Sequence, residues 1–173
     1  MPYDRRKLRG MYIYIQPLGK EWRPGSRIIP MELPDQARFH LRRFSEFMAV
    51  EMASLLQEAI DRQRYAYIWE PLSIEYYEYK KRNYLSLNIW EATGVLKDNI
   101  AAFRRGNTYM VGIHPERMYP GTLVPVHRVA RWMEYGTKKM PARPLFRPIT
   151  YFMGKHIRYY WDMYAIETGA GFV

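Results

Sequence analysis

The sequence predicts an α+β fold: a small, mostly antiparallel sheet packed by a long helix in the N-terminal half and by a C-terminal helix. Three observations lead to this prediction. Apolar residues recur at steps of three and four between residues 35 and 62, the period of an amphipathic helix. Two runs rich in apolar and aromatic residues flank Gly106–Asn107, a favoured two-residue hairpin turn. A second apolar stripe of helical period follows residue 145.

The N-terminal region is predicted to hold one strand and one irregular arm. Residues 11–15 read Met-Tyr-Ile-Tyr-Ile, and such β-branched and aromatic residues favour a strand. Residues 16–34 are interrupted by repeated prolines and glycines, and irregular segments of this length are usually either functional or disordered. We interpret them as an arm able to reach a neighbouring subunit. Asp35, directly after Pro34, is then expected to begin the long helix.

The middle of the chain is predicted to alternate short helices with a hairpin. Ser73 can cap a second helix that runs through Lys81, and Gly94 interrupts the helical pattern that follows. The hairpin strands are expected at residues 101–105 and 108–113.

The C-terminal part is predicted to hold two further helices. Val126–Tyr135 forms the first, and Gly136 is expected to end it in the left-handed conformation that other residues resist. The stripe of the last helix comprises Phe146, Ile149, Met153, Ile157, Tyr160 and Tyr164. The expected layout is an N-terminal strand and proline-rich arm at 1–34, an α+β domain at 35–168 and a mobile tail at 169–173.

Composition argues against most kinds of enzyme site. The chain has no cysteine, which excludes disulfides, thiolate metal ligands and thiol nucleophiles. The four histidines lie in no metal-ligand spacing, and no phosphate-binding glycine loop occurs. Glu75 and Glu78 lie one turn apart, but the basic run Lys80–Arg82 follows them and favours a solvated helix end. We therefore expect no catalytic residue, cofactor or metal, and the lack of a signal peptide or long apolar run indicates a cytoplasmic protein without a membrane partner.

Charge and aromatic content point to macromolecular partners. The net charge is +10, and aromatic residues make up 16% of the chain, a class enriched at protein interfaces. Both flanks are basic, whereas residues 44–99 carry an acidic excess, so the flank of one subunit could face the middle of another. The basic clusters match no motif that recognises a specific nucleic-acid sequence. They leave a second hypothesis open, a basic module that binds nucleic acid independently of its sequence.

Two segments carry a resemblance to a known family. The first is defined by Trp69, Pro71, Leu72, Ser73, Thr93, Gly94 and Leu96. The second lies within residues 130–148 and includes Glu134, Tyr135, Gly136, Thr137, Lys138, Lys139, Met140, Pro141, Arg143, Pro144, Phe146 and Arg147. In order and spacing they resemble the tail-completion and virion-morphogenesis family of the phage HK97 type.

The resemblance implies a structural virion protein of a tailed bacteriophage, with no enzymatic activity. Such a subunit would form a ring, a hexamer or a multiple of six, in the neck at the head–tail junction. Other neck and tail proteins would bind it, and the genomic DNA would pass through its channel. It would be assembled in the host cytoplasm. The roles of tail completion, tail terminator and head closure all remain open.

The second segment also has a physical interpretation of its own. Three prolines stiffen the backbone after Gly136. The apolar residues are expected to plug a hydrophobic surface: Met140, Leu145 and Phe146. The cations are expected to stay hydrated or to meet acidic groups, of which Glu134 is the nearest: Lys138, Lys139, Arg143 and Arg147. The segment could close the core of its own domain or form an interface between subunits, and both interpretations can hold together.

Overall fold

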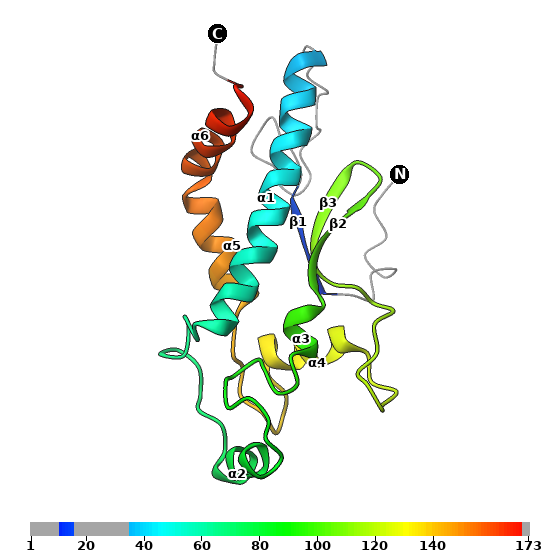
Figure 1. Cartoon of the computed structure of the whole chain (residues 1–173), viewed down its shortest axis with the longest axis vertical. Helices are drawn as coiled ribbons and strands as arrows, with labels where there is room; N and C mark the ends of the chain where they lie inside the picture. The colour runs from blue at the N-terminus through cyan, green and yellow to red at the C-terminus, as the bar shows by residue number, and fades with distance from the viewer. Residues whose placement is uncertain (1–10, 16–34, 171–173) are drawn as a thin grey trace.

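A computed structural model describes residues 11–15 and 35–170. The described elements form an elongated molecule in which helix α1 separates the sheet from the C-terminal helices (Figure 1). The elements in chain order are β1 (Met11–Ile15), α1 (Asp35–Asp61), α2 (Ile74–Arg82), α3 (Val95–Asp98), β2 (Ile100–Arg105), β3 (Thr108–Ile113), α4 (Val126–Tyr135), α5 (Phe146–Lys155) and α6 (Ile157–Thr168). The predicted α+β class is confirmed.

The three described strands form one antiparallel sheet in the order β1-β3-β2. Strand β3 is central: Ile113 is opposite Met11 of β1 on one side and opposite Ile100 of β2 on the other. The predicted hairpin is confirmed, with Gly106 at a φ of 62° in the turn. Its first strand begins at Ile100, one residue earlier than predicted.

The long helix supplies the centre of the core. Its predicted apolar stripe is confirmed, since Phe44, Met48, Met52 and Leu56 are all buried. One side of α1 packs against β2 and β3, and another side packs against α5 and α6. Helix α4 lies across the end of the sheet and contacts β1 and β3. Helix α1 therefore packs against two layers, the sheet and the C-terminal helices, which explains why its apolar stripe is wide.

The prediction of a single C-terminal helix is wrong in one respect. The structure has two helices there, α5 and α6, separated at His156. His156 has a φ of −108° and a ψ of 22°, outside the helical range, and Gly154 weakens the helix just before it. The break turns Tyr160 and Tyr164 into the core, while Ile157 of the predicted stripe is 53% exposed. Both helices pack mainly on α1, because α1 already covers this face of the sheet.

Two predicted segments lie outside the described residues: the arm at 16–34 and the end of the tail at 171–173. The predictions made for them stay predictions. Among the helices that the structure describes, none is both long and apolar enough to cross a membrane.

Candidate functional site

The two segments that carry the family resemblance meet in space. The indole N–H of Trp69 donates a hydrogen bond to the carbonyl of Pro144 at 2.7 Å. The guanidinium of Arg143 donates to the carbonyls of Glu70 and Pro71, at 2.7 and 2.9 Å. We call this contact, formed by residues 69–73 and 134–147, the junction. It brings together parts of the chain more than seventy positions apart.

Glu134 is the interior anchor of the junction. Its side chain accepts hydrogen bonds from the backbone N–H groups of Leu145, Phe146 and Arg147 at 2.7–3.1 Å. These groups begin α5, where backbone donors have no partner within the helix and where the helix dipole favours a negative charge. Arg147 completes the contact, since its Nε donates to the carboxylate at 3.1 Å. The predicted pairing of Glu134 with a nearby cation is therefore confirmed for Arg147.

Gly136 ends α4 as predicted, but in a different conformation. Its φ is 75° and its ψ is 177°, an extended conformation of positive φ that is almost restricted to glycine. A Cβ atom here would lie 2.8 Å from the backbone nitrogen of Ala142 and 2.9 Å from the carbonyl oxygen of Met140. Both the backbone angles and the lack of space therefore require glycine.

Residues 137–141 form an exposed turn that is braced by its own hydrogen bonds. The N–H of Thr137 donates to the carbonyl of Met140 at 2.7 Å. The hydroxyl of Thr137 accepts from the N–H groups of Lys139 and Met140 at 3.2 and 3.1 Å. Just beyond the turn, the N–H of Arg143 donates to the carbonyl of Met133 at 2.7 Å. The turn is thus fixed at both ends and displays two lysines to solvent.

The structure divides the predicted interface residues into three sets. The exposed set comprises Tyr135, Thr137, Lys138, Lys139, Pro141 and Arg147, whereas Gly136, Met140 and Pro144 are half-buried. Glu134, Arg143 and Phe146 are buried, so they act within the domain. The alternative that Arg143 stays hydrated is wrong, although the charge of nearby Glu70 does act on it and raises its pKa against the larger effect of burial. Arg143 is 5% exposed and serves backbone carbonyls of an irregular segment that no sheet or helix pairs.

The hydrophobic surface that Leu145 and Phe146 were expected to plug is the interior of their own domain. Both belong to the hydrophobic core. The ring centroid of Phe146 lies 6.1 Å from that of Trp90, a buried residue of the loop after α2. The interpretation that this segment closes the domain's own core is therefore correct for its C-terminal half.

The residues of the first segment have mainly local roles. The hydroxyl of Ser73 accepts from the N–H of Tyr76 at 3.3 Å and caps α2, as predicted. Gly94 has a φ of 81° at the start of α3, and Leu96 of α3 is buried. The other members are Trp69, which is buried, Leu72 and Gly94, which are half-buried, and Pro71 and Thr93, which are exposed.

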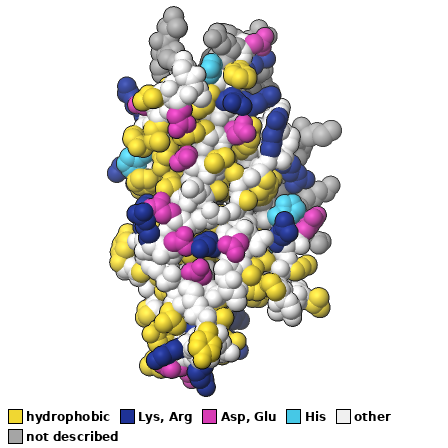
Figure 2. Space-filling view, in the orientation of Figure 1, with side chains coloured by type: hydrophobic (Ala, Val, Ile, Leu, Met, Phe, Trp, Pro, Cys, Tyr) yellow, Lys and Arg dark blue, Asp and Glu magenta, His cyan; other side chains and the backbone are white. Residues whose placement is uncertain are grey.

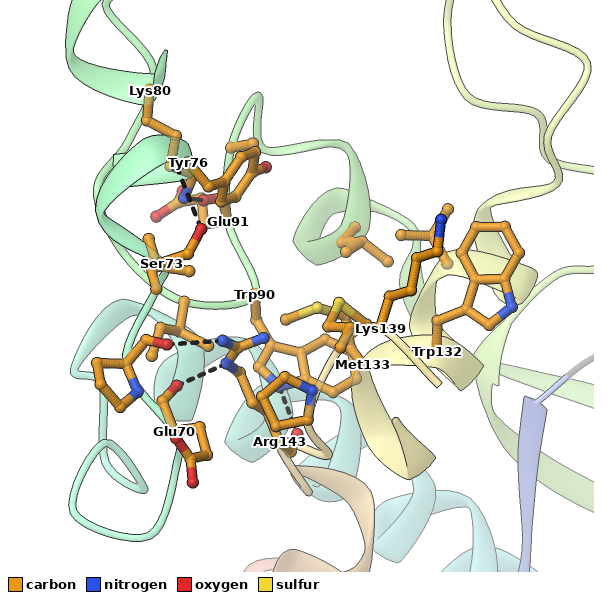
Figure 3. A pocket seen from close by; sticks show the side chains of 18 of the residues that line it. Glu70, Ser73, Tyr76, Lys80, Trp90, Glu91, Trp132, Met133, Lys139 and Arg143 are labelled. Carbon is orange, nitrogen blue, oxygen red and sulfur yellow. Dashed lines mark hydrogen bonds between the residues drawn. The ribbon is translucent and has the colours of Figure 1, made fainter. Parts of the chain in front are cut away.

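A pocket of about 660 Å³ opens beside the junction (Figure 3). Helix α2 and the loop after it form one wall, and α4 with the segment after it forms the other. Most of the lining is apolar and includes Leu72, Ile89, Val129 and Met133. Such a concave apolar surface with a few polar groups is typical of a binding site.

Two cations with unusual surroundings line this pocket. Lys80 is 1% exposed, and its ammonium donates to the carbonyls of Asn88, at 2.7 Å, and Glu91. Burial lowers the pKa of Lys80 and also that of Arg143 below their ordinary values. The expectation of a solvated helix end is thus wrong for Lys80. No pattern distinguishes Lys80 in advance, because Lys80 and Lys81 are adjacent residues of the same kind.

Trp90 is a second residue that sequence analysis missed. Its indole N–H donates to the carbonyl of Arg143 at 2.8 Å, and its φ of 68° is uncommon for a bulky residue. Among residues 11–15 and 35–170, no group of three or more His, Cys, Asp or Glu side chains is placed to hold a metal ion. The site therefore offers binding contacts: apolar walls, two buried cations and a braced turn.

Comparisons with known proteins place the chain in no family: no family model, no curated protein and no solved structure matches it.

Proposed function

We propose that the chain is a structural, non-enzymatic subunit of a tailed-phage virion, a tail-completion or neck protein that forms a ring at the head–tail junction. The family resemblance of residues 69–148 supports the proposal. The observation that carries it is the braced turn at 137–141. Core closure requires the buried residues that flank the turn, but it gives no reason for a rigid turn of exposed lysines between them.

A rigid turn is suited to assembly. Ordering a flexible loop on binding costs free energy, whereas a turn that is already ordered avoids most of this cost. The hydrogen bonds of Thr137 hold Lys138 and Lys139 in one arrangement before any partner arrives. The acidic middle of a neighbouring subunit would be a complementary surface for them.

Ring closure also requires a second, different face on each subunit. The outer side of α5 and α6 provides one, because aromatic and aliphatic side chains are exposed along it: Tyr151, Phe152, Ile157, Tyr159 and Ile166. Hydrophobic side chains also gather with Lys and Arg over the α2 end of the molecule (Figure 2). Tyrosine is among the residues enriched in interface cores. We propose that the α5–α6 face contacts a neighbouring subunit, and that the α2 end contacts another neck or tail protein.

The proposed mechanism is mechanical. A ring of six subunits or a multiple would complete the tail, offer a docking surface to the head connector and leave a channel for the genomic DNA. Its place would be the virion neck. The identity of neighbouring genes gives an inexpensive check, since a portal, major tail protein or tape-measure gene beside this one would support the assignment.

Native mass spectrometry of the full chain, alone and with neighbouring virion proteins, tests the proposal. We expect a ring, alone or only in the presence of those proteins. Replacing Lys138 and Lys139 by Glu should reduce assembly, because it reverses the charge of the turn without touching the core. The control is Arg104→Glu with Arg105→Glu on the exposed β-hairpin, which should assemble normally. A strict monomer that binds no virion component would overturn the proposal.

A second function, sequence-independent nucleic-acid binding, has one observation in its favour. Arg42 and Arg43 of α1 and Arg104 and Arg105 of the hairpin are exposed, and none forms an ion pair with another described residue. A salt titration separates the two functions. A nucleic-acid binder loses affinity steeply as salt rises, because bound counterions are released from the phosphates. Here we expect weak binding without a steep slope.

A further inference from the structure

Two cations in the pocket lack a carboxylate partner. Lys80 and Arg143 are both almost fully buried, and both line the same pocket. Their hydrogen bonds go to backbone carbonyls, and neither lies within ion-pair distance of an acidic side chain of the described chain. Burying a charge is costly unless an opposite charge accompanies it. The pocket therefore has a wall with two buried cations that form no direct ion pair.

Two carboxylates also line the pocket, those of Glu70 and Glu91, and neither forms an ion pair with Lys80 or Arg143. The carboxylate of Glu91 accepts from Ser86 and Asn88, and it pairs with Lys97 at 3.5 Å. Burial is the main reason why the pKa of Lys80 is lowered, the charge of Glu91 raises it in part, and the charge of Arg143 lowers it further. The charge of Glu70 likewise raises the pKa of Arg143 in part, but burial outweighs it. The two cations thus repel each other across the wall. An anion beside them would remove the repulsion and restore the pKa of Lys80 toward its ordinary value.

Donors remain for such an anion. An ammonium has three N–H donors and a guanidinium has five, and the carbonyl contacts described above use two of each. Both groups form part of the pocket lining (Figure 3). A carboxylate is the acceptor that fits, because it is planar and takes two donors side by side.

The rest of the lining describes the remainder of the occupant. Leu72, Leu96, Val129 and Met133 offer aliphatic walls, which suit aliphatic or aromatic side chains. The rim continues onto apolar surface outside the pocket, because Ile74 and Trp132 line it and are also exposed. An occupant that covers both the wall and the rim is longer than a small acid. A chain segment has this shape.

We propose that this pocket binds a carboxylate-bearing apolar peptide segment of a partner protein, with an acidic side chain against Lys80 and Arg143 and its apolar neighbours on the aliphatic walls and rim. The inference rests on the proposed assembly function, since it names the kind of partner segment that docks at the α2 end. A nucleic-acid strand fits less well. It would place a charged phosphate or a polar base edge against each aliphatic wall.

The test uses two capped tripeptides, acetyl-Leu-Glu-Phe-amide and its Gln analogue, titrated into the full chain by isothermal calorimetry or NMR. The two peptides have the same shape and differ in charge. We expect the Glu peptide to bind about ten-fold or more tightly, because bonds between charged groups are roughly twice as strong as neutral ones.

Matched lysine variants assign the preference to the buried wall. Lys80→Met should remove most of the preference for the Glu peptide, whereas Lys81→Met, at the exposed neighbouring position, should keep it. If Lys80→Met does not fold, Trp132→Ala at the rim provides a second readout. This variant should weaken both peptides by a similar factor and leave their ratio unchanged, since Trp132 carries no charge.

Several outcomes would overturn the inference. Equal affinity for the two peptides, or binding of neither, would remove the charge argument. Hydrocinnamate binding as tightly as the Glu peptide would assign the pocket to small acids, and displacement of the peptide by a short single-stranded oligonucleotide would assign it to nucleic acid. Native mass spectrometry of the same sample keeps the two proposals apart. If the chain forms a ring but binds neither peptide, only the pocket assignment is overturned. If the chain stays monomeric but prefers the Glu peptide, the pocket assignment is supported and the ring is not.

Discussion

The upper and lower parts of the molecule in Figure 1 are each stabilised by a different kind of contact. In the upper part, α1 packs against β2 and β3 and against α5 and α6 through apolar side chains such as Phe44, Met52 and Tyr164. In the lower part, around the junction, the buried charged side chains of Glu134 and Arg143 bond to the backbone. The upper part depends on packed area, and the lower part depends on individual hydrogen bonds.

The difference follows from the backbone itself. Helices and strands pair their own N–H and C=O groups, so their interfaces need only fit in shape. The segments at 69–73 and 137–145 are irregular and have few such partners. Side chains therefore supply the hydrogen-bond partners of these backbone groups. When such a buried bond is lost, the backbone group that stays unpaired costs its full desolvation free energy. We expect conservative changes to be tolerated in the upper part and to be costly in the lower part.

The largest effect is expected for Gly136→Val. The added side chain meets backbone atoms of Met140 and Ala142 and forces a β-branched residue to a φ of 75°. The free energy of unfolding should fall by about 3–5 kcal/mol, or the turn should rearrange. Urea denaturation measures the loss. Gly121→Val is the control, because Gly121 also has a positive φ but no atom lies within 4 Å of its Cβ, so about 1–2 kcal/mol is expected. Equal losses would contradict the steric argument.

Glu134→Gln tests the comparison directly. The change keeps the size of the side chain but places an amide N–H₂ among backbone donors that need an acceptor. Stability should fall by about 3 kcal/mol. The counterpart in the upper part is Met52→Leu, a swap of similar size in the buried face of α1, which should cost about 1 kcal/mol or less. If the two variants unfold at the same urea concentration, the distinction between the two parts fails.

Trp69→Phe should have a smaller effect. It removes the indole N–H and leaves the carbonyl of Pro144 without this bond, while most of the aromatic packing stays. A loss of about 1–2 kcal/mol is expected. Thermal unfolding followed by circular dichroism measures it. An unchanged midpoint would show that the bond between the two segments contributes nothing measurable.

The smallest effect concerns pH and His127 of α4. His127 is buried, its Nδ1 has no partner among the described residues, and burial lowers the pKa of its imidazole below the usual 6.5. The folded state therefore disfavours the protonated form. The contribution of neutral His127 to the free energy of unfolding is complete above pH 6.5 and declines as the pH falls toward the lowered pKa. His127→Gln should reduce this acid sensitivity. Identical pH profiles for the variant and the parent chain would contradict the assignment.

Sequence patterns predicted the elements whose causes are local. The stripe of α1, the hairpin at Gly106 and the end of α4 at Gly136 each follow from spacing or from one residue's backbone preference. The division of the C-terminal helix had only a weak sequence signal, Gly154, and His156 itself carries no helix-breaking signal. Both helices pack on α1, and such packing is not visible in a single sequence.

The candidate site was predicted in its position but only partly in its arrangement. The segments around Trp69 and Gly136 were both identified, and their contact was not. A side chain bonding to a distant carbonyl has no periodicity and no spacing rule. Lys80 shows the limit most clearly, since nothing in the sequence separates it from Lys81, yet one is buried and the other is exposed.

The carboxylate of Glu134 has a consequence for how motion would pass through the molecule. It belongs to the last turn of α4, and it holds the first turn of α5. The exposed turn between these two helix ends is therefore a short closed link. A displacement of that link moves the start of α5, and α5 rests on α1, which spans the upper part. In the proposed ring, contact with another subunit at the exposed turn would thus be transmitted along the long axis to the upper part.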